Sequence, residues 1–279
     1  MRKVSAIITT RNRSELLPRA VNSVMEQTFA VFECIIVDDC SEDNTRKVSN
    51  DLIKKYGSRL IYHRLTTQSG ACVARNIATE ISSGDFIAGI DDDDEWTKDR
   101  IEVLLNNYNP DLAYVTGRNL MLLPNYKQKK SQNPLKITVK KMLAYNCAGN
   151  QILTEKSKIL QVGGSDPNLT AAQDYDLYLR LNEMYGDAIC VNKVLQIIHQ
   201  EHQKGNITQK AKLGYINFYF KHILKFNRRQ KVCQIFRIKQ ITGGEIKLKY
   251  LCFAQDFFVF SKMLKYYILK LFYPQHRTN

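Results

Sequence analysis

Five consecutive carboxylates follow one apolar run, and their spacing suits a divalent metal ion. Phe86–Ile90 leads directly into Asp91, three further aspartates and Glu95. Alternate residues of an extended segment face the same side, so we expect Asp91 and Asp93 to point at one target. Carboxylate oxygens suit Mg²⁺ or Mn²⁺, with other positions left for substrate phosphates. The alternatives are a solvated acidic turn before a helix, or a calcium loop, which Trp96 disfavours by standing where that loop needs glycine.

Two further polar groups could bind a nucleotide. Asp38 and Asp39 follow the apolar stretch FECIIV, where an acid can accept hydrogen bonds from a base or a ribose. The alternative is a turn or helix cap built with Ser41. Gly70 permits close backbone approach, and Arg75 after it could grip a phosphate. The simpler interpretation of this second group is the start of a helix with one surface arginine.

A helical stretch over 171–184 carries two aspartates near its start. Asp176 and Arg180 are four residues apart and can pair on one helix face. Asp174 has no such partner, so it could serve as a general base. The alternative is a first-turn acid that the helix dipole favours.

Two histidines flank Glu201. If they face the acidic run, either His199 or His202 could complete a metal shell. They lack the spacing of a two-cysteine, two-histidine zinc finger. On an exposed surface they would have no role in metal binding.

Alternating strands and helices must position these residues. Apolar, β-branched runs predict buried strands at Val4–Thr9, Phe32–Val37, Leu60–Arg64 and Phe86–Ile90. Helices are expected between them, the first capped by Ser14 and the third over Ala71–Ile81. This alternation predicts a mainly parallel sheet, with ligands beyond the carboxyl ends of its strands, where the polar groups fall. A second strand-rich region is expected at about 145–162, and a helical pattern follows Gly205.

Charge is distributed unevenly along the 279 residues. The net charge is +14, and residues 205–279 hold 15 of the 41 Lys and Arg but 2 of the 27 Asp and Glu. The same segment holds 15 of the 27 Phe and Tyr residues. A basic, aromatic tail predicts contact with an anionic surface, either a membrane or a nucleic acid.

Membrane spans and secretion are not expected. No run reaches the roughly 18 uncharged apolar residues that a span needs, and the N-terminus lacks the apolar region of a signal peptide. The seven cysteines have no CxxC spacing and are odd in number, which is typical of reduced thiols in a cytoplasmic protein.

Taken in order, these stretches resemble glycosyltransferase family 2, the inverting transferases of GT-A fold. The resemblance covers about residues 3–208 and rests on VSAIITTRNR, IIVDDCSEDNT, GACVARN, GDFIAGIDDDDEW, GNQILTEKSKILQVGGSDPNL and AAQDYDLYLRL. Within the family, SGACVARN, GIDDDDEW and IIHQEHQKGNIT look most like enzymes of colanic-acid and other exopolysaccharide or lipopolysaccharide clusters. The resemblance implies a Rossmann-like α/β catalytic domain over 1–208 with a mainly parallel central sheet. It leaves a basic, aromatic helical appendage over 209–279.

The resemblance also implies roles for the matching residues. Those that would contact the nucleotide-sugar donor are Thr10, Arg11, Asn12, Asp38, Asp39, Arg75, Asp91 and Asp92. Asp93 would ligate Mn²⁺ or Mg²⁺, with His202 or His199 as a late metal contact, and Asp174 would be the general base. Thr9 stands where the family pattern has Pro, which weakens the turn at the end of the strand but touches no chemistry. Ser165 stands where the pattern has Phe, so the shape of the acceptor pocket stays open.

The implied activity is transfer of a hexose from a nucleotide-diphosphate sugar, with UDP as the expected nucleotide. The acceptor would be a lipid-linked glycan of a bacterial exopolysaccharide, capsule or O-antigen, at the inner face of the plasma membrane. The alternatives are transfer to polyprenyl phosphate, or a non-catalytic protein that binds nucleotide sugars. Nucleic-acid binding is not expected, because no recognition motif accompanies the basic tail. A nucleotidyltransferase would usually carry an early Gly-rich basic loop, which is absent.

Overall fold

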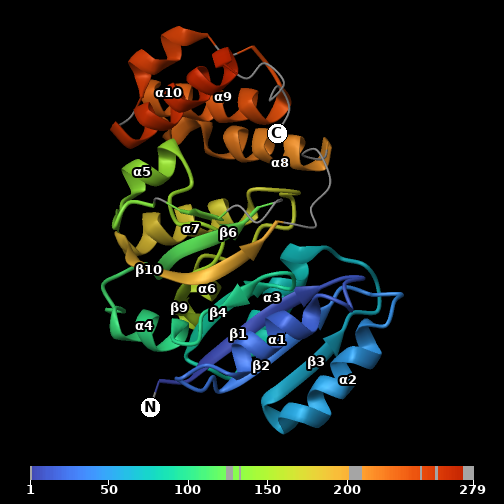
Figure 1. The fold of residues 1–279 in the computed structure, drawn as a ribbon. Helices are drawn as coiled ribbons and strands as arrows, with labels where there is room; N and C mark the ends of the chain where they lie inside the picture. The colour runs from blue at the N-terminus through green and yellow to red at the C-terminus, as the bar shows by residue number, and fades with distance from the viewer. Residues whose placement is uncertain are drawn as a thin grey trace.

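The structure, a computed structural model, describes residues 2–123, 128–131, 133–200, 209–245, 247–254 and 257–272. Ten strands among them form one mixed sheet, ordered β3-β2-β1-β4-β9-β6-β10-β5, with β7 and β8 paired at its margin. Helices flank this sheet, and the last three lie together at the end of the molecule next to β6 and β10 (Figure 1).

The first half of the sheet is parallel, as its apolar runs predict. Its strands are β1 (Val4–Thr10), β2 (Glu33–Asp38), β3 (Leu60–Arg64) and β4 (Phe86–Asp91). They are paired in parallel and connected by α1 (Leu17–Met25), α2 (Thr45–Tyr56) and α3 (Ala71–Ile81). Because β2 is buried on both faces, its apolar run is continuous, whereas the outer strand β3 is half-exposed. All four strands therefore end at one edge of the sheet.

The start of α1 differs from the prediction. Ser14 does not cap the helix, which begins at Leu17 with Pro18 in its first turn. Proline fits there because the first amides of a helix have no intrahelical partner. The backbone N–H of Ser14 donates instead to Asp43 at 3.0 Å, which joins the loops that follow β1 and β2.

The second half of the sheet is mixed. Its strands are β5 (Glu95–Trp96), β6 (Val115–Leu122), β7 (Gln128–Lys130), β8 (Lys136–Ile137), β9 (Leu153–Glu155) and β10 (Ala188–His199). β9 runs antiparallel to β4 and β6, while β10 runs parallel to β6. The helices here are α4 (Arg100–Asn106), α5 (Val139–Ala144), α6 (Lys156–Gln161) and α7 (Gln173–Tyr185).

The expected strand-rich region at 145–162 is wrong. It contains β9 alone, and α6 follows at once. The longer strands β6 and β10 pair with each other across more than 70 residues of sequence. Several residues of each strand are only half-buried, so neither strand shows a continuous apolar run in the sequence.

The helical pattern after Gly205 is confirmed by α8 (Gln209–His222), α9 (Arg228–Thr242) and α10 (Phe257–Phe272). Phe218 of α8 is fully buried with Tyr175 and Leu179 of α7 in one apolar cluster. The first helix of this region thus packs into the core beside the sheet, and a domain boundary at residue 208 stays a prediction. No helix of the described segments is long and apolar enough to cross a bilayer.

Candidate active site

Strained backbone marks the loops where the predicted site residues lie. In the described segments, the non-glycine residues with positive φ are Asn12 (52°), Cys40 (61°) and Ala172 (59°). Asn12 follows β1, Cys40 follows β2, and Ala172 immediately precedes α7. Such conformations cost free energy and concentrate at functional sites. They therefore single out these three loops.

The loops after β1 and β2 hold each other. The N–H of Asn12 donates to Ser41 Oγ at 2.9 Å, and the N–H of Glu42 donates to Asn12 Oδ1 at 2.8 Å. Asp38 is fully buried and accepts hydrogen bonds from Ser41 Oγ (2.5 Å) and Tyr62 OH (2.6 Å). Asp38, predicted as a donor contact, thus lies behind the loop and supports it. Two further predicted donor contacts precede Asn12 in the first loop and differ in exposure. Thr10 is buried, whereas Arg11 is exposed.

Asp39 joins the second loop to α3. Its two oxygens accept hydrogen bonds from the backbone N–H groups of Ser69 (2.6 Å) and Gly70 (2.9 Å). Gly70 has φ of 90°, a conformation that favours glycine. In this structure the predicted nucleobase contact therefore also fixes the start of the helix that carries Arg75.

The acidic run turns where extended geometry was expected. The N–H of Asp94 donates to the carbonyl of Asp91 at 3.1 Å, which closes a tight turn. Asp91 accepts from Gln151 Nε2 at 3.0 Å, whereas Asp93 accepts from Arg13 Nη1 at 2.7 Å. The expected extended geometry is therefore wrong here, and residue alternation no longer places Asp91 and Asp93 on one face. That both carboxylates meet one target stays a prediction.

Arg13 and Gln151 are residues that the sequence reasoning missed. Arg13 also pairs with Asp92 at 3.0 Å, and burial still raises the pKa of Asp92 despite this cation. A Cβ atom on Gly89 would lie 2.2 Å from Gln151 Oε1, so the glycine gives the amide room to reach Asp91. Arg13 stands in the stretch VSAIITTRNR and Gln151 in GNQILTEKSKILQVGGSDPNL, so both could have been recognised there.

His199 lies beside the acidic run. Its Nε2 is 3.4 Å from Glu95 Oε2, and its backbone N–H donates to Asp94 Oδ1 at 3.3 Å. Burial, together with the nearby charge of Asp91, raises the pKa of Asp94 to about 7. His202, the other predicted metal contact, lies outside the described residues.

A metal ion would have few protein ligands here. Within the described ranges no group of three or more His, Cys, Asp or Glu side chains is arranged to hold one. Asp93 does offer a hard oxygen ligand that already faces a cation, Arg13, and is 16% exposed. Such a site suits a divalent ion of the Mg²⁺ type, which often takes one or two carboxylates and completes its shell with substrate phosphates.

Arg75 lies between Asp91, at the end of β4, and Asp174, at the start of α7. Its guanidinium lies 3.5 Å from Asp91 Oδ1 and 3.6 Å from Asp174 Oδ1. A cavity of about 40 Å³ beside this pair is lined by Gln151 and Tyr178. Burial raises the pKa of Asp174 to about 6, with Arg75 opposing the shift and Asp91 adding to it. A carboxyl with this pKa is ionised at neutral pH and is basic enough to accept a proton.

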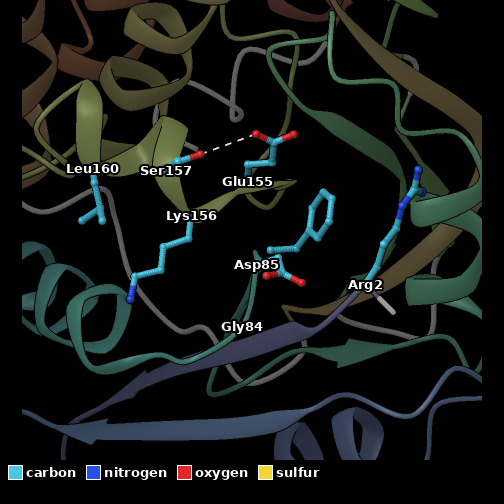
Figure 2. A pocket seen from close by; sticks show the side chains of 8 residues that line it. Arg2, Gly84, Asp85, Glu155, Lys156, Ser157 and Leu160 are labelled. Atoms are coloured by element: carbon cyan, nitrogen blue, oxygen red, sulfur yellow. Dashed lines mark hydrogen bonds between the residues drawn. The ribbon is translucent and has the colours of Figure 1, made fainter.

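A larger pocket lies at the opposite edge of the sheet. It has a volume of about 610 Å³ and is lined by Arg2, Asp85 and Lys156, near the amino end of β4 (Figure 2). Lys156 donates to the carbonyls of Glu80 (3.0 Å) and Ser82 (2.5 Å), and Asp85 accepts from a backbone N–H. These charged groups are already paired, and the strained loops lie elsewhere, so we place the candidate site at Asp91 and Asp174.

Comparison with known proteins shows what family and fold the chain shares. The family model described as Glycosyl transferase family 2 matches residues 5–153. The chain is 35% identical over 248 residues to the putative colanic acid biosynthesis glycosyl transferase WcaA of Escherichia coli K12, which covers 86% of this chain and 88% of that protein. It is 30% identical over 179 residues to the UDP-Glc:alpha-D-GlcNAc-diphosphoundecaprenol beta-1,3-glucosyltransferase WfgD of E. coli, covering 64% and 69% of the two chains. S. aureus TarS 1–349 in complex with UDP-GlcNAc shares the fold with a TM-score of 0.60, 15% identity, and coverage of 95% and 91%.

Proposed function

The chain belongs to glycosyl transferase family 2, and from this premise we propose that it inverts the anomeric centre of a donor sugar with Asp174 as general base. The observation that carries the proposal is the position of Arg75, between Asp174 on α7 and Asp91 at the end of β4. That position puts a basic carboxylate next to the loops where the fold would hold a nucleotide.

In this mechanism Asp174 takes the proton of an acceptor hydroxyl as the hydroxyl attacks the anomeric carbon. The nucleoside diphosphate leaves from the opposite face, so one displacement inverts the configuration. Arg75 keeps Asp174 ionised and directs its carboxylate toward the donor side. The loops after β1, β2 and β4 hold the donor in place, and positioning of this kind is worth on the order of 7–11 kcal/mol.

We propose that the donor is a UDP-hexose and that the acceptor is a lipid-linked glycan of a bacterial surface polysaccharide. Two similarities support this substrate class. The name of WfgD gives UDP-Glc as donor and a diphosphoundecaprenol-linked sugar as acceptor, and that of WcaA gives colanic acid biosynthesis. The identity of the hexose depends on pocket contacts, which shift specificity by only a few kcal/mol.

We further propose that Asp93 holds Mn²⁺ or Mg²⁺, with His199 or His202 as an additional ligand. Its partly exposed carboxylate and its present cationic partner, Arg13, support this role. When bound, the ion would neutralise negative charge on the diphosphate leaving group.

The test is nucleotide release from UDP-glucose, UDP-galactose and UDP-N-acetylglucosamine, each with Mn²⁺, Mg²⁺ or EDTA. We expect slow hydrolysis of one donor that stops when EDTA removes the metal. If no donor is hydrolysed, calorimetric titration with UDP and Mn²⁺ decides between a missing acceptor and an incorrect function. A protein that binds neither ligand contradicts the proposal.

We also propose that the C-terminal helices contact an anionic membrane surface. Apolar side chains stand exposed on them, including Phe220 (62%) and Leu224 (97%). Arg228 and Arg229 follow Leu224 closely in the chain and are also exposed. An apolar surface bordered by arginines complements anionic head groups, and this contact would bring the enzyme to a lipid-linked acceptor.

The double substitution of Phe220 and Leu224 by Glu is expected to reduce flotation with phosphatidylglycerol vesicles severalfold, because it adds charge where apolar contact is proposed. Leu160→Glu, at an exposed apolar residue of α6 (46%), is the control and should float like the wild type. Equal flotation of all three proteins, or equal binding to phosphatidylcholine vesicles, would contradict membrane contact by this surface. Deleting the tail would be a poor test, because Phe218 belongs to the core.

A further inference from the structure

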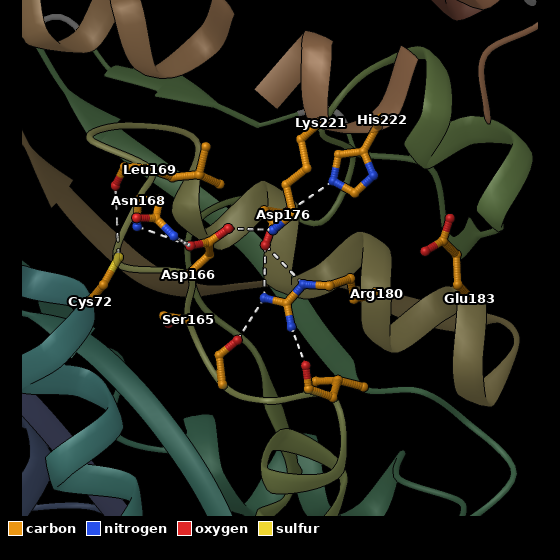
Figure 3. A network of polar contacts seen from close by, with 12 residues as sticks. Cys72, Ser165, Asp166, Asn168, Leu169, Asp176, Arg180, Glu183, Lys221 and His222 are labelled. Atoms are coloured by element: carbon orange, nitrogen blue, oxygen red, sulfur yellow. Dashed lines mark hydrogen bonds and ion pairs between the residues drawn. The ribbon is translucent and has the colours of Figure 1, made fainter. Parts of the chain in front are cut away.

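Asp176 anchors the first turn of α7, two residues after Asp174. Its carboxylate is fully buried and lies 2.8 Å from Arg180 Nη2, 2.8 Å from Lys221 Nζ and 2.8 Å from His222 Nε2 (Figure 3). Burial disfavours the charged form, but hydrogen bonds from His222 and Lys221 and the charge of Arg180 outweigh it, so the pKa of Asp176 is well below its ordinary value. Two of these three donors come from the end of α8.

The same network holds the loop that leads into α7. Lys221 also pairs with Asp166 Oδ2 at 2.6 Å, and Arg180 donates to the carbonyl of Gly164 at 2.6 Å. The next residue, Ser165, exchanges two backbone hydrogen bonds with the side chain of Asn76, at 2.8 and 2.9 Å. Asn76 follows Arg75 on α3. One set of contacts therefore connects α8 both with α3, which carries Arg75, and with α7, which carries Asp174.

Packing also brings α8 against the residues on either side of Asp174. A Cβ atom on Gly214 would lie 2.2 Å from the backbone N of Ala171, so the backbones of α8 and of the loop before α7 touch there. Phe218 stacks on Tyr175 with ring centroids 4.1 Å apart, one residue after Asp174. The start of α7 therefore lies directly against α8 both before and after Asp174.

We propose that α8 positions the catalytic base, with His222 and Lys221 as positioning residues that act through Asp176. The inference rests on the proposed role of Asp174. His222 and Lys221 share Oδ1 of Asp176, while Arg180 holds Oδ2. Removing either of the first two therefore weakens the pairing of a buried carboxylate, which costs free energy unless the helix turn moves. A displacement of about 1 Å at a reacting group can cost on the order of 10²-fold in rate. The C-terminal region would then be part of the catalytic unit.

The test compares His222→Leu and Lys221→Met with Lys225→Met. Lys225 is the matched control, because it ends the neighbouring 3₁₀ turn η3 (Ile223–Lys225) and pairs at 2.6 Å with Glu183, near the far end of α7. We expect the first two variants to lower kcat for UDP release at least tenfold, with donor KM and UDP affinity within about twofold of wild type. Lys225→Met should retain wild-type kcat. His222→Gln, which keeps an N–H donor, should recover most of the loss.

Equal kcat in His222→Leu, Lys221→Met and Lys225→Met would overturn the inference. A loss of UDP affinity parallel to kcat, or no recovery by His222→Gln, would also overturn it, because either result describes general damage. If His222→Leu does not fold, Lys221→Met decides, since its side chain is already 31% exposed.

Amide hydrogen exchange of residues 171–178 separates this inference from the proposed function. Faster exchange there in His222→Leu, relative to Lys225→Met, supports positioning by α8 even if no donor is turned over. Unchanged exchange would contradict positioning even in an active enzyme. A wild-type protein that binds no UDP contradicts the proposed function alone.

Discussion

Asp174→Asn is expected to lower sugar transfer by about 10²–10⁴-fold, the range that a general base contributes. The amide cannot take the proton of the acceptor hydroxyl, but it has the size of the carboxylate and leaves the donor loops intact. UDP affinity should therefore stay within about twofold of wild type. Release of UDP in the presence of acceptor or water measures transfer, and calorimetry measures donor binding.

Asp187→Asn is the matched control, because Asp187 forms an exposed ion pair with Lys136 and should tolerate the change. A second readout is the pH dependence of the wild-type enzyme. Since the active form of Asp174 is ionised and its pKa is raised to about 6, the rate should be full above that pH and fall as pH drops through it. Normal turnover by Asp174→Asn would remove Asp174 as the base.

Asp93→Ala is expected to lower kcat/KM by on the order of 10³-fold and to abolish the response to Mn²⁺. The reason is that charge stabilisation by a metal ion is worth several kcal/mol in the transition state. The variant should stay folded, because Asp93 is partly exposed and its contact with Arg13 lies at the surface. UDP release at varied Mn²⁺ concentration, with and without EDTA, measures the effect.

Asp99→Asn provides the control for this variant. Asp99 lies a few residues further along, pairs with the exposed Lys193, and does not belong to the turn at 91–94. It should keep the wild-type metal response. If Asp93→Ala responds to Mn²⁺ like the wild type, another residue holds the ion, and a wild-type enzyme insensitive to EDTA would contradict metal dependence altogether.

The sequence could assign a role to those residues that directly follow a recognisable strand. The parallel strands β1 to β4 follow from buried apolar runs, because a central parallel strand is covered on both faces. Asp39, Asp91 and Asp93 follow those runs directly, so their arrival at one sheet edge is a consequence of parallel topology. Asp174 was suggested by its lack of a helical partner and assigned as the base by the family resemblance, but its distance in sequence hides its place in space.

Contacts between distant segments were decided by the tertiary structure alone. β6 and β10 pair across more than 70 residues, and Gln151 reaches Asp91 across 60. Neither contact leaves a periodic pattern, because each depends on how the chain packs and not on neighbouring side chains. The turn at Asp91 likewise overrides the alternation expected for an extended strand.

The sequence by itself determined the family, the parallel half of the sheet and the carboxylates at its edge. Only the tertiary structure placed Arg75 between Asp91 and Asp174 and brought His222 of α8 onto Asp176. The physical reason is that a buried charge is stable only beside its partners. Those partners come from whichever segments the fold brings together.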